Sequence, residues 1–173
     1  MKRLTLFACV CLFAVTGRAE LEWKEGGRVL LYGNSFVERL QEHGLFEACV
    51  RMALVEKKLE FRSLAWTGDE VGYRLRPERY VNHLKELLEK WPADALLLGF
   101  GLNESFAGEG GLPKFRTDLA GYLDEMERRH PEAALVLLSP IASEDTGNPL
   151  HPGPDERNEE IRAYAEIMRK VAK

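Results

Sequence analysis

Ser35 is the residue whose surroundings best suit chemistry. It follows Gly33 and Asn34 at the end of an apolar run that begins at Val29. Apolar side chains then recur at helical spacing, at Phe36, Val37 and Leu40. Ser35 is therefore expected at a helix N-terminus, where backbone N–H groups and the helix dipole favour negative charge. Two interpretations follow: Ser35 is a nucleophile at the edge of a sheet, or it only caps its helix.

Short apolar runs alternate with amphipathic helical patterns along the rest of the chain. The runs predict strands over 29–33, 59–65, 93–100 and 134–138, and those over 29–33 and 93–100 are expected to be buried. Helical patterns follow Ser35, with a bend or restart at His43-Gly44, and then open near Pro77, follow Pro113 and close the chain over 161–168. This alternation is typical of an α/β fold, and we expect a three-layer α/β/α sandwich with a short parallel sheet.

The predicted topology brings four polar segments together. Right-handed crossovers place the carboxyl ends of parallel strands along one edge of the sheet. The segments that follow the four runs contain Ser35, Gly68, Asn103 and the loop 139–154. Their convergence favours the interpretation of Ser35 as a nucleophile over that of a helix cap.

The same segments resemble the sequence blocks of the SGNH or GDSL-type serine hydrolases, which have a flavodoxin-like α/β fold. Gly33-Asn34-Ser35 stands where that family has Gly-Asp-Ser, and Gly101-Leu102-Asn103 resembles its Gly-x-Asn block. Asn148-Pro149-Leu150-His151-Pro152 resembles the Asp-x-x-His-Pro block before the last helix. The strings 66–69 and 101–106 also resemble the SGNH module of some large exported bacterial proteins.

The resemblance implies a role for each of four residues. Ser35 would be the nucleophile and His151 the base, while Ser35 N–H, Gly68 N–H and the Asn103 side chain would form the oxyanion hole. Such chemistry needs both parts, because a hydroxyl attacks an ester only when a base removes its proton and the oxyanion needs preorganised donors. The implied activity is hydrolysis of small-molecule or carbohydrate esters, acetyl esters included, through an acyl-serine intermediate without cofactor or metal.

Two departures from the family pattern keep an alternative open. Asn148 stands where the family has aspartate, and an amide cannot stabilise an imidazolium by charge. The nearby carboxylates that could replace it are Asp145, Glu144 and Asp155. In the related modules of large proteins the histidine lies a few residues later, where this chain has Arg157-Asn158. The alternative is thus a catalytically impaired SGNH-like module that binds a glycan or a partner protein.

Three residues beside the proposed machinery are weaker candidates for substrate binding: Asn34, Trp66 and Glu104. Trp66 suits stacking on a sugar ring, although a tryptophan next to a loop more often closes the edge of a core. Glu104 adjoins Asn103, and the competing interpretation is a solvated or helix-capping carboxylate.

The first 19 residues resemble a secretory signal peptide. Lys2 and Arg3 precede an apolar run over 4–15, and Gly17-Arg18-Ala19 resembles a cleavage site. The run is too short to span a membrane stably. We therefore expect an exported protein, periplasmic or secreted, whose residues 20–173 form a single domain. The leader carries three of the 24 basic residues and no acidic one, so 21 basic and 28 acidic residues remain, and nucleic acid is an unexpected partner.

The cysteines and histidines outside these blocks predict little chemistry. Cys49 is the single cysteine beyond the leader, so no internal disulfide is expected, and its apolar neighbours predict a core position. The other histidines are His43, His83 and His130. They lack metal-ligand spacing, and solvated or capping roles are expected for them. Nothing in the sequence specifies an oligomeric state.

Overall fold

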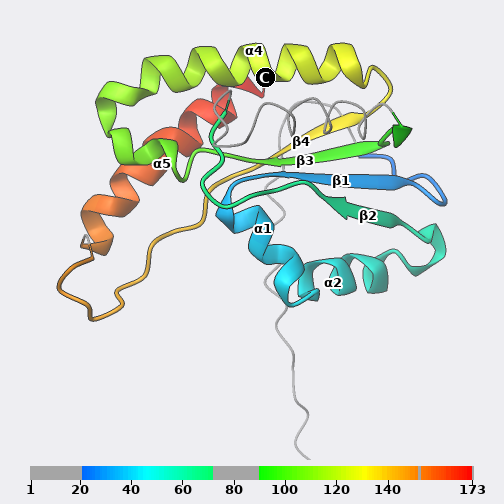
Figure 1. The fold of residues 1–173 in the computed structure, drawn as a ribbon, viewed down its shortest axis with the longest axis horizontal. Helices are drawn as coiled ribbons and strands as arrows, with labels where there is room; N and C mark the ends of the chain where they lie inside the picture. The colour runs from blue at the N-terminus through cyan, green and yellow to red at the C-terminus, as the bar shows by residue number, and fades with distance from the viewer. Residues whose placement is uncertain (1–20, 72–89, 152, 173) are drawn as a thin grey trace, which may run out of the picture.

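The computed structural model describes residues 21–71, 90–151 and 153–172 of the 173-residue chain. Four parallel strands form one sheet with the order β2-β1-β3-β4, as Figure 1 shows. The strands are β1 (Arg28–Gly33), β2 (Glu60–Ser63), β3 (Ala95–Gly99) and β4 (Ala134–Leu138). All four predicted strands are confirmed. The signal peptide and most of the helix predicted from Pro77 lie outside the described residues.

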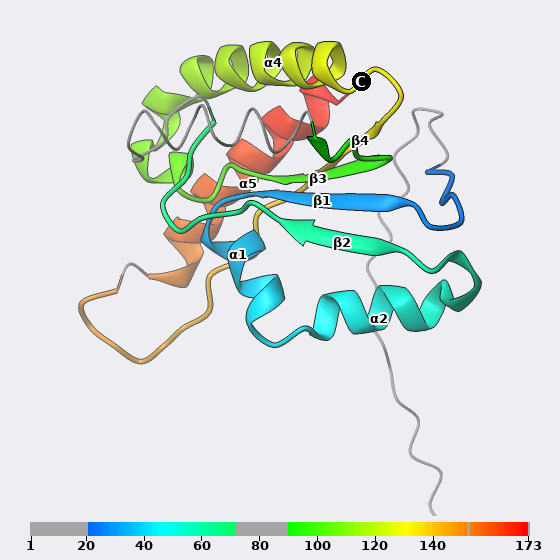
Figure 2. The same cartoon turned by 45° about the vertical axis from the view of Figure 1, so that its right-hand side comes forward.

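Helices cover both faces of the sheet (Figures 1 and 2). The helices α1 (Ser35–Glu42) and α2 (Leu45–Ala53) lie on one side, and α4 (Leu112–Arg129) and α5 (Pro154–Val171) lie on the other. The expected three-layer α/β/α sandwich is confirmed. The described residues also form three short 3-10 helices, at Val55–Lys57, Glu104–Ala107 and Glu109–Gly111.

The strands β1, β3 and β4 supply apolar side chains to both layers, which explains why each of these three is a continuous apolar run, whereas the edge strand β2 alternates exposed and partly buried residues. In β1, Val29 and Leu31 belong to the core cluster beneath α1 and α2, whereas Leu30 and Tyr32 belong to the cluster beneath α4 and α5. Two separate cores therefore hold β1 between them, and its carboxyl end is fixed from both sides.

The structure confirms the predicted break in the first helical pattern but corrects the position of Cys49. Gly44 adopts a left-handed conformation (φ 62°) between α1 and α2. Within α2, Phe46 and Val50 turn toward the core, and Cys49 is exposed. The prediction of a core cysteine was wrong because a helix restarted at Gly44 presents positions 46 and 50, one turn apart, to the sheet.

His130 is the C-cap of α4, in agreement with its expected capping role, but it is not solvated. It follows the last residue of α4, and it is buried, with 8% of its surface exposed. Burial and the neighbouring Arg129 charge lower the pKa of its imidazole. Within the described residues its Nε2 atom has no hydrogen-bond partner. None of the helices in the described part of the chain has the length and apolar character needed to cross a membrane.

Candidate active site

The turn that carries Ser35 is set by a close approach between the ends of β1 and β3. Gly33 pairs with Gly99 in the sheet register, and the Asn34 N–H donates to the Gly99 carbonyl oxygen at 3.1 Å. A Cβ atom on Gly33 would lie 2.1 Å from that oxygen, and the Gly33 φ of 153° is itself unfavourable for a side chain. Only glycine at position 33 therefore allows the chain to turn into α1 at this point.

Asn34 caps α1, and Ser35 does not. The backbone of Asn34 is extended (φ −86°, ψ −165°), and its side-chain oxygen accepts the Phe36 N–H at 3.1 Å. Asn34 is buried, with 1% exposed, so the structure gives this weak candidate for substrate binding a structural role. Ser35 is half-buried, and within the described residues its hydroxyl has no hydrogen-bond partner. The interpretation of Ser35 as a mere helix cap is thus wrong.

The turn that contains Gly68 lies against the start of α1. Trp66 N–H donates to the Gly33 carbonyl at 3.0 Å, and the Thr67 hydroxyl donates to the Glu38 carboxylate in α1. Gly68 has a positive φ of 81°, and its N–H donates to no acceptor within the described part of the chain. An amide left free beside a helix N-terminus is suited to bind an oxyanion. Trp66 is 49% exposed at the same edge.

Asn103 reaches the Gly68 turn from the end of β3. Its Nδ2 atom donates to the Asp69 carbonyl oxygen at 3.2 Å. A carboxamide nitrogen carries two hydrogens, so a second one remains for another acceptor. The structure therefore brings together three of the four predicted segments, those of Ser35, Gly68 and Asn103, through backbone and side-chain hydrogen bonds.

Glu104, next to Asn103, has both carboxylate oxygens engaged. One accepts the Val71 N–H at 2.9 Å, and the other accepts the Gly101 N–H at 2.7 Å. Burial raises the pKa of this carboxyl group. Glu104 therefore connects two loops through their backbone N–H groups. This role resembles the helix-capping interpretation of Glu104 more than the substrate-binding one.

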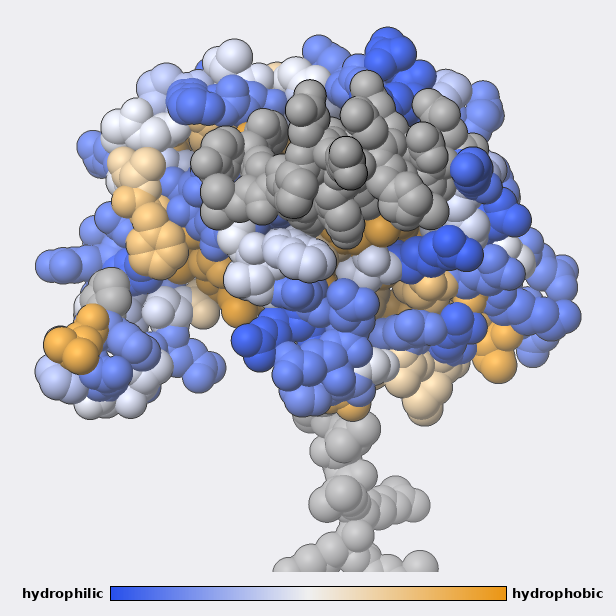
Figure 3. Space-filling view, in the orientation of Figure 1, coloured by the Kyte–Doolittle hydropathy of each residue, from blue (hydrophilic) through white to orange (hydrophobic). Residues whose placement is uncertain are grey.

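His151 lies in the loop between β4 and α5, which extends outward from the body of the molecule in Figures 1 and 2. The His151 side chain is exposed, with Nδ1 2.8 Å from the Thr146 hydroxyl oxygen and Nε2 3.4 Å from Asn148 Nδ2. Figure 3 shows hydrophobic surface at the tip of this loop, and Leu150 is 88% exposed. The structure thus holds His151 within its own loop, and its role as the base stays a prediction.

The predicted partners of His151 are also local to this loop. Asn148 approaches Nε2, the nitrogen that in a serine–histidine pair would face the hydroxyl, and not Nδ1. Asp145 accepts the Gly147 N–H at 2.8 Å. Among the described residues no carboxylate contacts the His151 ring. Within residues 21–71, 90–151 and 153–172, no three histidine, cysteine, aspartate or glutamate side chains lie close enough together to bind a metal ion.

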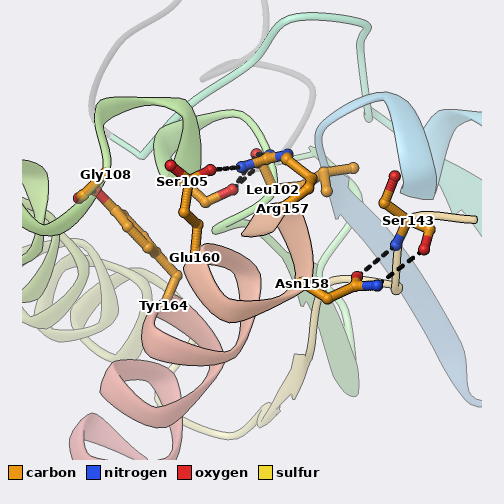
Figure 4. Close-up of polar contacts among 8 residues, drawn as sticks. All are labelled: Leu102, Ser105, Gly108, Ser143, Arg157, Asn158, Glu160 and Tyr164. Atoms are coloured by element: carbon orange, nitrogen blue, oxygen red, sulfur yellow. Dashed lines mark hydrogen bonds and ion pairs between the residues drawn. The ribbon is translucent and has the colours of Figure 1, made fainter. Parts of the chain in front are cut away.

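Arg157, in α5, binds the residues on either side of Asn103 and Glu104, a role that its sequence context does not predict. It is 4% exposed and donates to the Ser105 hydroxyl at 2.6 Å and the Leu102 carbonyl at 2.9 Å (Figure 4). The Arg157 guanidinium forms an ion pair with the Glu160 carboxylate, with an N–O distance of 2.9 Å. The guanidinium carbon of Arg157 lies 3.7 Å from the centre of the Phe106 ring. The one sequence signal was an arginine three residues before a glutamate, a pattern usual on solvated helices.

Asn158 fixes the start of the loop that carries His151. Its side chain accepts the Ser143 N–H at 2.7 Å and donates to the Ser143 carbonyl at 2.9 Å (Figure 4). The first turn of α5 thus holds both the Asn103 segment and residue 143, at positions where the alternative alignment would place the histidine.

No family model and no curated protein matches the sequence. The structure is similar to solved structures of esterases, such as the acetyl xylan esterase AlAXEase (19% identity, 84% of this chain against 72% of that chain, TM-score 0.59). Axe2, an acetylxylan esterase from Geobacillus stearothermophilus, gives 13% identity, 88% and 76% coverage and a TM-score of 0.58. A protein from Parabacteroides merdae assigned as a GDSL-like lipase gives 15% identity, 90% and 78% coverage and a TM-score of 0.60. The chain therefore has the fold of the SGNH/GDSL hydrolases.

Proposed function

We propose that this chain hydrolyses carboxylic esters with Ser35 as the nucleophile. The observation that carries the proposal lies at the start of α1. Asn34 caps the helix there, and the Ser35 hydroxyl has no hydrogen-bond partner within the described residues. The segments of Gly68 and Asn103 lie beside it and offer an amide and a carboxamide to an oxyanion.

In the proposed reaction, Ser35 Oγ attacks the ester carbonyl and loses its proton to His151. The negative charge on the carbonyl oxygen is stabilised by Ser35 N–H, Gly68 N–H and Asn103 Nδ2. His151 returns the proton to the leaving alcohol, and water then releases the acid from the acyl-serine. His151 does not contact Ser35 in the structure, so this role requires the loop between β4 and α5 to approach α1.

For the substrate we propose acetyl esters of carbohydrates. Two of the similar structures are acetyl xylan esterases, and the half-exposed Trp66 beside the Gly68 turn offers an aromatic face to a sugar ring. The leader-like first 19 residues fit this proposal, because an exported enzyme meets polysaccharides outside the cytoplasm.

The test is hydrolysis of p-nitrophenyl acetate by the wild-type protein and by Ser35→Ala, with Ser143→Ala as the matched control. The Ser143 side chain is not used by Asn158, which binds only the backbone of that residue. We expect Ser35→Ala to lose turnover to the background rate and Ser143→Ala to keep it. Equal rates for Ser35→Ala and wild type would refute the nucleophile.

One observation favours a second function, that of a non-catalytic module that binds a glycan. His151 is exposed and contacts Thr146 and Asn148, with no carboxylate behind its ring in the described chain. This second function predicts no ester hydrolysis by the folded protein, together with retention of acetylated xylan that Trp66→Ala abolishes. Turnover that depends on Ser35 would exclude it.

A further inference from the structure

The carboxylate of Glu104 joins the two loops that carry the proposed oxyanion donors. It accepts the Gly101 N–H at 2.7 Å, in the segment leading to Asn103, and the Val71 N–H at 2.9 Å, in the segment that follows Gly68. The two amides belong to segments about 30 residues apart in sequence, and one side chain connects them.

Asn103 and Glu104 together attach to the Gly68 side at two points. Asn103 donates to the Asp69 carbonyl at 3.2 Å, and Glu104 accepts from Val71 two residues later. Asp69 is itself buried, with 1% exposed, and its N–H donates to the Trp66 carbonyl at 3.1 Å. Two attachments restrain both the distance and the orientation of the Gly68 turn relative to Asn103.

The Asn103 and Glu104 segment is also held by α5, on the side away from Gly68. Ser105 is fully buried, donates to the Leu102 carbonyl at 2.6 Å and accepts from Arg157 at 2.6 Å (Figure 4). The 3-10 helix Glu104–Ala107 is therefore held from below. Because its base is fixed, a change at the Glu104 side chain acts mainly on the Gly68 segment that it holds.

We propose that Glu104 is a positioning residue that sets the separation of the Gly68 amide and the Asn103 carboxamide. The inference rests on the proposed esterase function. A carboxylate suits this task because each of its two oxygens accepts hydrogen bonds, whereas the amide of a glutamine has one accepting oxygen and a donating nitrogen. In Glu104→Gln one of the two backbone N–H groups, of Gly101 or of Val71, would face the amide nitrogen, which is a donor. That hydrogen bond would be lost, and the two loops would move apart.

The test compares Glu104→Gln with wild type, with Glu109→Gln as the control for loss of a nearby exposed carboxylate. On p-nitrophenyl acetate we expect Glu104→Gln to lower kcat by roughly 10- to 100-fold with little change in KM, since displacement of an oxyanion donor acts on the transition state. Glu104→Asp keeps the charge with a shorter reach, so a smaller loss is expected, and it serves if Glu104→Gln does not fold. Glu109→Gln should match wild type.

A double mutant separates positioning from a general loss of structure. If Glu104 sets the separation of the two donors, that separation matters less once one donor is absent, so Glu104→Gln should reduce kcat by a smaller factor in Asn103→Ala than in wild type. Amide hydrogen exchange at Gly101 and Val71 should rise in Glu104→Gln and not in Glu109→Gln. Three results in a folded, active Glu104→Gln protein would each overturn the positioning role alone. These are an effect on kcat that is fully additive with that of Asn103→Ala, a kcat equal to that of wild type, or amide exchange equal to that of wild type. A wild-type protein without esterase activity would overturn the proposed function, and the inference with it.

Discussion

Replacing Gly33 with alanine should disrupt the turn that presents Ser35. The new Cβ would lie 2.1 Å from the Gly99 carbonyl oxygen and 2.8 Å from its carbonyl carbon, distances that require the two backbones to separate. The φ of 153° adds strain that a glycine does not have. Overpacking costs about 1–3 kcal/mol and an unfavourable backbone conformation about 1–3 kcal/mol, so we expect Gly33→Ala to lower the free energy of unfolding by about 2–6 kcal/mol.

Gly121→Ala is the matched control, because Gly121 lies inside α4 and a Cβ there would meet no atom within 4 Å. An alanine in an open helical position should raise the free energy of unfolding by about 0.5–1 kcal/mol. Urea unfolding followed by circular dichroism measures both variants against wild type. Shifts of the two midpoints in opposite directions are expected. A Gly33→Ala midpoint equal to that of wild type would refute the close approach of β1 and β3.

Three further predictions concern the oxyanion donor, a buried histidine and the loop between β4 and α5. Asn103→Ala should lower kcat about 10²- to 10³-fold without unfolding the protein, and steady-state hydrolysis of an aryl acetate measures this; a loss below threefold would contradict the donor role. Burial lowers the pKa of His130 in the folded state, so below its ordinary value near 6.5 the unfolded chain binds the proton more readily and wild-type stability should fall as pH decreases. Urea unfolding at pH 7.5 and 5 should show a smaller drop for His130→Gln, and an equal drop would contradict this assignment. Asn158→Ala removes both hydrogen bonds to Ser143, so limited proteolysis should cut residues 139–153 faster than in wild type, and an unchanged cleavage rate would show that those bonds do not restrain the loop.

The sequence predicts most of the fold because the signal for it is local. Strands covered on both faces must be apolar at every position, so β3 and β4 are visible as short uninterrupted runs. The break between α1 and α2 is visible because Gly44 takes a conformation that other residues avoid. The exposure of Cys49 could not be predicted, because it depends on the rotation of a helix that begins again after that glycine.

The site is predictable only in part, since its decisive contacts join distant segments. The sequence left open whether Ser35 caps α1, and the structure decides this because the Asn34 side chain reaches the Phe36 N–H. In the sequence, Glu104 resembles a solvated carboxylate and Arg157 resembles a cation on a helix surface. Their roles come from partners far along the chain, Val71 for the carboxylate and Leu102 for the guanidinium.

The most direct test of the nucleophile is reaction of the folded wild-type protein with a fluorophosphonate, followed by mass spectrometry of the intact protein and of its peptides. We predict one adduct per chain, located on Ser35 and absent from Ser35→Ala. Protein with a cooperative unfolding transition that forms no adduct, or that carries the adduct on another residue, would contradict the assignment of Ser35.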